Sequence, residues 1–361
     1  MTKRYLILQD GTTYVGEAFG SPATTFGEIV FHTAMTGYQQ VITNPIYYNQ
    51  IVMFTTPTIG AIGVNHMADE AITPTIKGVV VREMADISTN RLQQMSLGSY
   101  LERHNIPGIS NIDTRALTRH LRQTGTQNAS IVDVPDDHAF DQLNAMVLTT
   151  RQVPQVSTPK AYANPGRGAN VVVIDFGLKN GILRQLSDYD ANITVLPYNA
   201  TLDEVTNLDP DGIVLSSGPG DPRQLPPELF KMIKAFQAEV PLFGIGLGHE
   251  IFALANGADL TPLSVDHHGM NHPIREQITG RILFANQGAG YSVDRATLVD
   301  TDLMITHVDL MDNAVQGLRH RDFPAFSVQF FPDAAPGPYE ATNIFTEFME
   351  LVSARKDGKL G

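Results

Sequence analysis

The second half of the chain alternates continuous apolar runs with amphipathic segments. The apolar runs predict strands: NVVVIDFG (170–177), ITVLPYN (193–199), DGIVLSSGPGD (211–221) and PLFGIGLG (241–248). The amphipathic segments predict helices: KNGILRQLSD (179–188), ELFKMIKAFQA (228–238) and HEIFALANGA (249–258). This alternation is typical of a parallel sheet covered by helices on both faces. Ligands of such sheets bind beyond the carboxyl ends of the strands, so we expect a site near the turns SSGPGD and GIGLGHE.

Residues 1–150 follow a different pattern. YLILQDGTTYVGEAFG (5–20) predicts a β-hairpin, because Asp-Gly is a turn dipeptide between two strand-like runs. SLGSYLERHNIPGIS (96–110) predicts a helix followed by a strand, and GVVVRE (78–83) a short buried strand. DTRALTRHLRQTG (113–125) predicts a helix with an Asp cap at its start and Gly at its end. These elements indicate a mixed α/β domain.

The segment RQVPQVSTPKAYANPGR (151–167) contains three prolines and shows no periodicity, so we expect a linker there. A length of 361 residues fits two domains. The predicted organisation is an α/β protein with an N-terminal mixed α/β domain (1–150), the linker, and a C-terminal domain (168–361). The C-terminal domain is expected to hold a mostly parallel sheet flanked by helices.

Composition and charge exclude several kinds of function. The formal net charge of -13 argues against a general nucleic-acid-binding surface, which needs clustered Lys and Arg. The sequence has no cysteine, which excludes disulfides, thiolate metal sites and cysteine nucleophiles. No apolar run approaches the roughly 20 residues that span a bilayer, and the N-terminal apolar run reaches Asp10 too soon for a signal peptide. We therefore expect a cytoplasmic protein.

The stretch PLFGIGLGHE (241–250) predicts a buried strand, a sharp turn and the start of a helix. Many hydrolases place a serine or cysteine nucleophile at the apex of such a turn. Here the apex is Gly246. Glycine relieves the backbone strain of the turn, so the turn is retained while its nucleophile is absent.

Two further segments are ambiguous from the residues alone. SSGPGDP (216–222) follows a strand, and its Gly218 and Gly220 form either a backbone cradle for a ligand or merely a tight turn. FSVQFFPDAAPGP (326–338) predicts a strand that ends at Phe331. Asp333, two residues later, is either a catalytic acid or a turn residue.

The segment DHHGMNHP (266–273) gathers His267, His268 and His272. Imidazoles are common metal ligands, but no helical spacing is present and no Cys or Glu completes a familiar ligand set. We expect a polar surface loop and no metal.

Taken together, these segments resemble the small subunit of carbamoyl phosphate synthetase over nearly the whole chain. GEIVFHTAMTGYQQVITNPIYYNQIVMFTTPTIGAIGVN (27–65) and GISNIDTRALTRHLRQTGT (108–126) resemble the segments that distinguish this family. The second half resembles a class I glutamine amidotransferase, with its motifs in the family order. The resemblance implies glutamine hydrolysis and transfer of ammonia to a large, ATP-using subunit. That subunit makes carbamoyl phosphate for pyrimidine and arginine synthesis, and the small subunit itself needs no cofactor.

The residues that the resemblance places in the active site have changed. The family uses a cysteine nucleophile, a histidine base and a glutamate, and the matching positions here are Gly246, Phe331 and Asp333. No intact catalytic triad is therefore expected. In the glutamine pocket some positions match the family: Gly218, Gly220, Leu247, Gly290 and Tyr291. Others are altered: Ala34, Glu250, Gly288 and Ala289.

Three interpretations follow. The first is a catalytically inactive small subunit that still binds the large subunit as a structural or regulatory partner. The second is an active amidotransferase with Ser216 or Ser217 as nucleophile and a histidine base; the candidate bases are His249, His267, His268 and His272. The third is a free sensor module in which backbone amides bind a small molecule such as glutamine. The family-specific N-terminal segments favour a partner-bound role, with neither nucleic acid nor membrane as partner.

Overall fold

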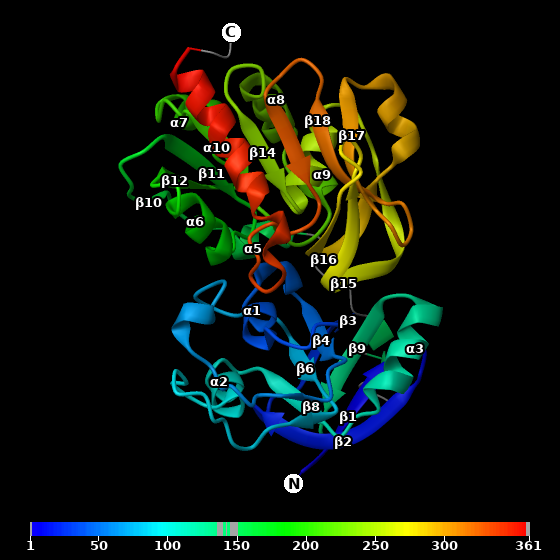
Figure 1. Cartoon of the computed structure of the whole chain (residues 1–361). Coiled ribbons are helices and arrows are strands. Elements are labelled where there is room, and N and C mark those ends of the chain that lie inside the picture. Colours follow the sequence, from blue (N-terminus) through cyan, green and yellow to red (C-terminus); the bar gives the residue numbers. More distant parts are fainter. Residues whose placement is uncertain (1, 136–139, 142, 145–150, 359–361) are drawn as a thin grey trace. The chain divides into compact units, whose positions relative to one another are not determined.

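The computed structural model describes residues 2–135, 140–141, 143–144 and 151–358 (Figure 1). The chain forms two compact units, residues 1–149 with 264–269 and residues 150–263 with 270–361. The segment 264–269 lies far along the sequence, and the hydrophobic pattern gave no sign that it belongs to the first unit. None of the helices in the described part of the chain combines the length and the apolar character that a membrane crossing requires.

The first unit is built on a closed barrel with the strand order β1-β2-β8-β6-β4-β3-β9. Alternate residues such as Leu6, Ile29 and Ile51 fill its core, and Leu117 and Leu121 of a covering helix pack with them. Its strands are β1 Lys3–Leu8, β2 Thr13–Gly20, β3 Thr25–His32, β4 Gln50–Phe54, β6 Gly78–Val80, β8 Pro107–Ser110 and β9 Gln127–Val132, with β5 Thr58–Ile59 paired to β7 Glu83–Met84 outside the barrel. Its helices are α1 Tyr38–Ile42, α2 Leu97–Arg103 and α3 Thr114–Thr124.

Several local predictions for this unit are confirmed. β1 and β2 pair antiparallel, with Ile7 opposite Thr13 across the Asp-Gly turn. The Asp113 carboxylate accepts a hydrogen bond from the Ala116 backbone N–H (2.9 Å) at the start of α3, and Gly125 follows its last residue. These features depend on neighbours in the sequence, which is why the pattern predicted them.

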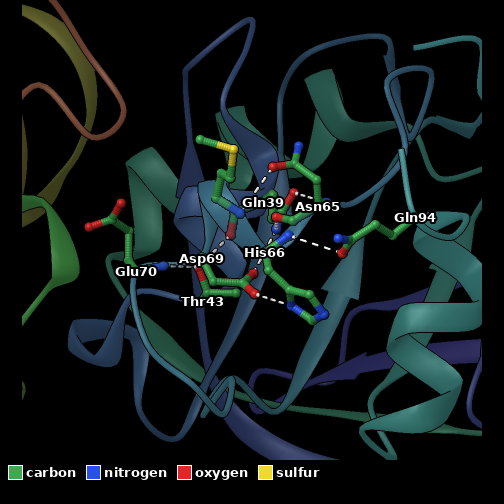
Figure 2. Close-up of polar contacts among 8 residues, drawn as sticks. Gln39, Thr43, Asn65, His66, Asp69, Glu70 and Gln94 are labelled. Carbon is green, nitrogen blue, oxygen red and sulfur yellow. Dashed lines mark hydrogen bonds and ion pairs between the residues drawn. The ribbon is translucent and has the colours of Figure 1, made fainter. Parts of the chain in front are cut away.

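A polar network fixes the segment that follows β5 (Figure 2). The Gln39 side chain donates to the Asn65 carbonyl (2.5 Å) and to the Asp69 carboxylate (2.6 Å), and it accepts from the Asn65 backbone N–H (3.0 Å). The His66 Nδ1 lies 3.2 Å from the other Asp69 oxygen. Met67, within this fixed segment, is 84% exposed. The network therefore fixes a segment that exposes the apolar side chain of Met67 to solvent.

The second unit contains a ten-stranded sheet with the order β10-β12-β11-β13-β14-β19-β18-β17-β15-β16. The five strands β12, β11, β13, β14 and β19 are parallel, as expected from their unbroken apolar sequences. β10 pairs antiparallel with β12, and β18, β17 and β15 extend the other side antiparallel. The strands are β10 Tyr162–Asn164, β11 Asn170–Asp175, β12 Asn192–Pro197, β13 Gly212–Leu215, β14 Leu242–Ile245, β15 Leu260–Glu276, β16 Ile282–Val293, β17 Leu303–Asp309, β18 Val315–His320 and β19 Ala325–Val328.

Helices cover both faces of this sheet. Successive residues of a strand point to opposite faces, so an unbroken apolar strand has apolar side chains to bury on each face. Leu242 packs with Ile233 in the core that α8 and α9 share. The next residue, Phe243, contacts Phe345 and Phe348 of α10, with ring centroids 5.6 and 5.7 Å apart. The helices are α5 Val153–Val156, α6 Asn180–Ser187, α7 Leu202–Thr206, α8 Pro227–Phe236, α9 Leu247–Ala255 and α10 Asn343–Lys356. The α/β architecture expected from the sequence is therefore confirmed.

The expectation of a linker at 151–167 is wrong. This segment contains α5 and β10, and β10 adds an edge strand to the sheet, with Tyr162 opposite Val195. A proline occupies the first turn of α5, where its missing N–H costs no hydrogen bond. Elements of three and four residues are too short to show a period, so only the neighbouring strand reveals β10.

Candidate functional site

The turn between β14 and α9 has the geometry expected of a nucleophile turn. Gly246 adopts φ 57° and ψ -114°, a conformation that L-residues rarely adopt, and its N–H donates to the Val328 carbonyl (2.9 Å). A Cβ atom at this position would lie 3.1 Å from Cε1 of Phe331 and 3.3 Å from Cβ of Ser217. A side chain at this position would therefore press against the Phe331 ring, which would have to shift by a few tenths of an ångström.

Phe331 reaches this place after the strand has ended. The sequence predicted a strand up to Phe331, but β19 ends at Val328. Phe331 forms an isolated bridge to β16 instead, through its N–H and the Asn286 carbonyl (2.8 Å). Its side chain is 2% exposed. Phe331 thus stays buried beyond the end of β19, with its ring beside Gly246 and the Lys179 ammonium.

Asp333 is bound to a lysine that the sequence analysis did not single out. Lys179 Nζ lies 3.0 and 2.8 Å from the two Asp333 carboxylate oxygens, and both side chains are fully buried. The same ammonium lies 4.7 Å from the centroid of the Phe331 ring. The three altered positions thus join one structural cluster. Nothing in the sequence marks Lys179, because it lies 154 residues from Asp333 and looks like an ordinary residue at a helix start.

The Gly-rich loop has structural reasons for its composition. A Cβ at Gly218 would lie 2.2 Å from the Phe176 carbonyl oxygen, so only glycine allows the loop to approach the end of β11 so closely. Ser216 accepts a hydrogen bond from the Phe176 N–H and donates one to the Ser217 carbonyl, both at 2.9 Å. The close approach of the loop to β11 therefore explains Gly218 without a ligand.

Neither serine is paired with a base. In the part of the chain that the structure describes, no hydrogen bond joins Ser216 or Ser217 to a histidine. His249 is fully buried, and its Nδ1 lies 2.9 Å from the Ser327 hydroxyl. Burial lowers the pKa of His249 to about 3, so its imidazole is neutral at physiological pH. Its hydrogen bond holds it toward Ser327.

Other expected pocket residues lie in the second unit. Leu247 begins α9, where the first amides have no partner within the helix. Gly288, Ala289, Gly290 and Tyr291 lie in β16. The Tyr291 ring is 5.3 Å from the Arg223 guanidinium, whose charge is paired with Asp221.

Glu250 is the altered position with the most unusual environment. It lies in α9 and is 4% exposed. Burial raises the pKa of its carboxyl to about 8, although the Gln329 amide, which donates to Oε1 at 3.0 Å, opposes that shift. A carboxyl with this pKa is largely protonated at neutral pH.

The histidine-rich segment is not a surface loop, which corrects the sequence expectation. Residues 266–273 belong to β15. His268 is 7% exposed and lies against Tyr47, with ring centroids 5.3 Å apart and ring planes inclined by 43°. His272 Nδ1 lies 3.7 Å from a carboxylate oxygen of the fully buried Asp309. Most residues of this segment are only half buried, so the strand carries polar side chains. Its composition therefore resembles that of a loop.

Comparison with known proteins gives the family. The model described as carbamoyl-phosphate synthase small chain, CPSase domain, matches residues 6–131, and that of glutamine amidotransferase class-I matches residues 172–351. The chain is 52% identical over 356 residues to the carbamoyl phosphate synthase small chain of Streptococcus pyogenes serotype M3, which covers 98% of both chains. The chain belongs to the carbamoyl phosphate synthase small chain family.

Two further relatives of this family span the chain equally well. The carbamoyl phosphate synthase pyrimidine-specific small chain of Lactiplantibacillus plantarum is 52% identical over 359 residues, covering 99% of this chain and 98% of the relative. The carbamoyl phosphate synthase small chain of Listeria monocytogenes serotype 4b is 46% identical over 362 residues, covering 100% and 99%. The family recognised from the sequence is therefore confirmed, including its amidotransferase domain.

One altered position of this family member lies in the first unit. Ala34 follows β3, is 4% exposed, and its N–H donates to Nδ1 of His32 (3.3 Å). The methyl side chain of Ala34 has no group that donates or accepts a hydrogen bond.

Proposed function

We propose that this chain is a small subunit of carbamoyl phosphate synthetase that does not hydrolyse glutamine. It serves a large subunit as a structural or regulatory partner in the cytoplasm. The large subunit makes carbamoyl phosphate from ammonia and ATP, for pyrimidine or arginine synthesis, and this chain itself binds no cofactor. The observation that carries the proposal is the Phe331 ring, whose Cε1 lies 3.1 Å from the place of a Cβ at Gly246.

The chemistry of glutamine hydrolysis needs a nucleophile and a base within hydrogen-bond reach. Gly246 offers no nucleophilic atom, and Phe331 has no group that transfers a proton. Asp333 is held by Lys179 and has no imidazole to orient. A serine substitute has less support, because both hydrogen bonds of Ser216 go to the backbone.

The first test compares nitrogen sources. The large subunit of the same organism is co-expressed with this chain, and the purified complex is given ATP, bicarbonate and either glutamine or ammonium. We expect carbamoyl phosphate from ammonium only. Synthesis from glutamine at a comparable rate would contradict the proposal. As a control, an unrelated glutaminase is added together with glutamine, and synthesis should then occur because the large subunit receives ammonia.

We further propose that the large subunit binds the first unit through an apolar patch formed by Ile62, Met67, Ile87 and Leu92. These four side chains are 49%, 84%, 77% and 58% exposed. They lie on two segments joined by backbone hydrogen bonds, such as Gln94 N–H to the Val64 carbonyl (2.9 Å). Exposed apolar patches of soluble proteins often mark interaction surfaces. The small-chain family model covers this unit, which supports a partner particular to the family.

A charge placed in this patch is expected to weaken the complex. Met67→Glu should raise the Kd for the large subunit at least tenfold, roughly the 1–2 kcal/mol typical of a central interface residue. The measurement is isothermal titration calorimetry with both purified subunits.

The matched control is Val299→Glu, at an apolar side chain of the second unit that is 82% exposed. It should leave the Kd unchanged. Equal effects of the two variants, or none from Met67→Glu, would contradict the proposed surface.

A further inference from the structure

Glu250 and Gln329 form a buried pair that the proposed function does not use. Glu250 lies in α9 and Gln329 directly follows β19, and they are 4% and 2% exposed. Gln329 Nε2 donates to Glu250 Oε1 at 3.0 Å. The amide and the carboxyl therefore face each other in a region without solvent.

The remaining oxygen of each group is an acceptor without a donor. In the part of the chain that the structure describes, Glu250 Oε2 and Gln329 Oε1 are both buried and have no hydrogen-bond partner. Buried polar atoms of folded proteins nearly always have one, and leaving one unpaired is unfavourable. One proton on the Glu250 carboxyl would give both oxygens a partner. A carboxylic acid carries a donor and an acceptor side by side, as an amide does.

We propose that Glu250 is protonated in the folded protein and that its Oε2–H donates to Gln329 Oε1, which closes an acid–amide pair. In this form Glu250 presents the same donor and acceptor as a glutamine side chain, and its position stays uncharged. Loss of the proton breaks the second hydrogen bond and places a negative charge in α9. The pair is thus a pH-sensitive element, and it goes beyond the proposed function because it needs neither the partner nor glutamine.

The surrounding groups agree with an uncharged Glu250. Burial is the largest influence and raises the pKa of Glu250 to about 8. The Asp221 carboxylate also raises this pKa and the Arg223 guanidinium lowers it, but these two groups pair with each other at 2.8 Å. Tyr291 of β16 faces the same group, and burial raises its pKa, so that it stays uncharged. The neighbouring His249 is neutral, since burial lowers its pKa to about 3.

The sign of the pH dependence follows from linkage. A carboxyl of the unfolded chain ionises near its ordinary pKa of 4.5, whereas folded Glu250 keeps its proton up to about pH 8. Between these values the folded state holds a proton that the unfolded state has released, so stability falls as pH rises. The stabilisation by the protonated pair is fully present below the pKa of the unfolded chain, 4.5. It is lost above the pKa of folded Glu250, about 8.

The test compares wild type with Glu250→Gln in urea unfolding from about pH 5 to about pH 9. Glutamine keeps both hydrogen bonds without a proton, so the variant should fold. The ratio of the folding equilibrium constants, variant over wild type, should rise about tenfold per pH unit within the window and level off above about pH 8. Exposed Glu228, changed to Gln, is the control and should give a profile parallel to wild type.

A second measurement does not depend on unfolding. The carboxyl carbon of Glu250, assigned by ¹³C NMR as the signal absent from Glu250→Gln, should titrate in the alkaline range. Titration near the ordinary value of 4.5, or parallel stability profiles of wild type and Glu250→Gln, would overturn the proposal.

Discussion

A cysteine introduced at the nucleophile turn, Gly246→Cys, is expected to leave glutamine hydrolysis at background. The new Cβ would stand 3.1 Å from Cε1 of Phe331, and the backbone at φ 57° would be strained by about 1–3 kcal/mol. No base lies at position 331 to form a thiolate, and burial among apolar groups raises a thiol pKa above its ordinary value of about 8.5. We therefore do not expect a nucleophile alone to support glutamine hydrolysis.

Restoring all three positions should behave differently. In Gly246→Cys/Phe331→His/Asp333→Glu the imidazole takes the place of the ring that now closes the turn, and it can accept the thiol proton. We expect glutamine hydrolysis at least ~100-fold above the single variant, the lower range of a general base. The pH dependence of alkylation by iodoacetamide should show a lowered thiol pKa in the triple variant only.

These two measurements separate catalysis from folding. Alkylation reports on the thiol even if hydrolysis stays weak. If Gly246→Cys alone hydrolysed glutamine as fast as the triple variant, Phe331 and Asp333 would not be what prevents the reaction.

The second large effect concerns the stability of the altered site. Lys179→Met should lower the free energy of unfolding by about 3–5 kcal/mol, because it leaves the Asp333 carboxylate buried without a partner. The loss of the ammonium beside the Phe331 ring adds to this effect. Urea unfolding followed by circular dichroism measures the change.

Two comparisons test the reason given. In Lys179→Met/Asp333→Leu the unpaired charge is gone, so most of the lost stability should return. Arg223→Met breaks an exposed ion pair with Asp221 and should cost no more than about 1 kcal/mol. A double variant as unstable as Lys179→Met alone would show that packing, and not the unpaired carboxylate, causes the loss.

The local elements and the family can be predicted from the sequence. The Asp-Gly hairpin, the caps of α3 and the unbroken strands of the parallel sheet depend on residues close in the chain. The motifs gave the family and showed that Gly246 stands where a nucleophile is expected. Such signals are readable because turn chemistry, capping and burial on both faces of a sheet each leave a mark within a few residues.

The contacts of the altered positions could not be predicted from the sequence and are known from the fold alone. From the sequence, Asp333 is either a catalytic acid or a turn residue, and its partner Lys179 comes from a helix start 154 residues away. The sequence shows Glu250 only as an altered position of the expected pocket, whereas its burial in the fold raises the pKa of its carboxyl. The edge strand β10 and the place of residues 264–269 in the first unit were equally hidden. The physical reason is common to all of them: desolvation, ion pairing and strand pairing depend on which distant residues meet, and no local pattern records that.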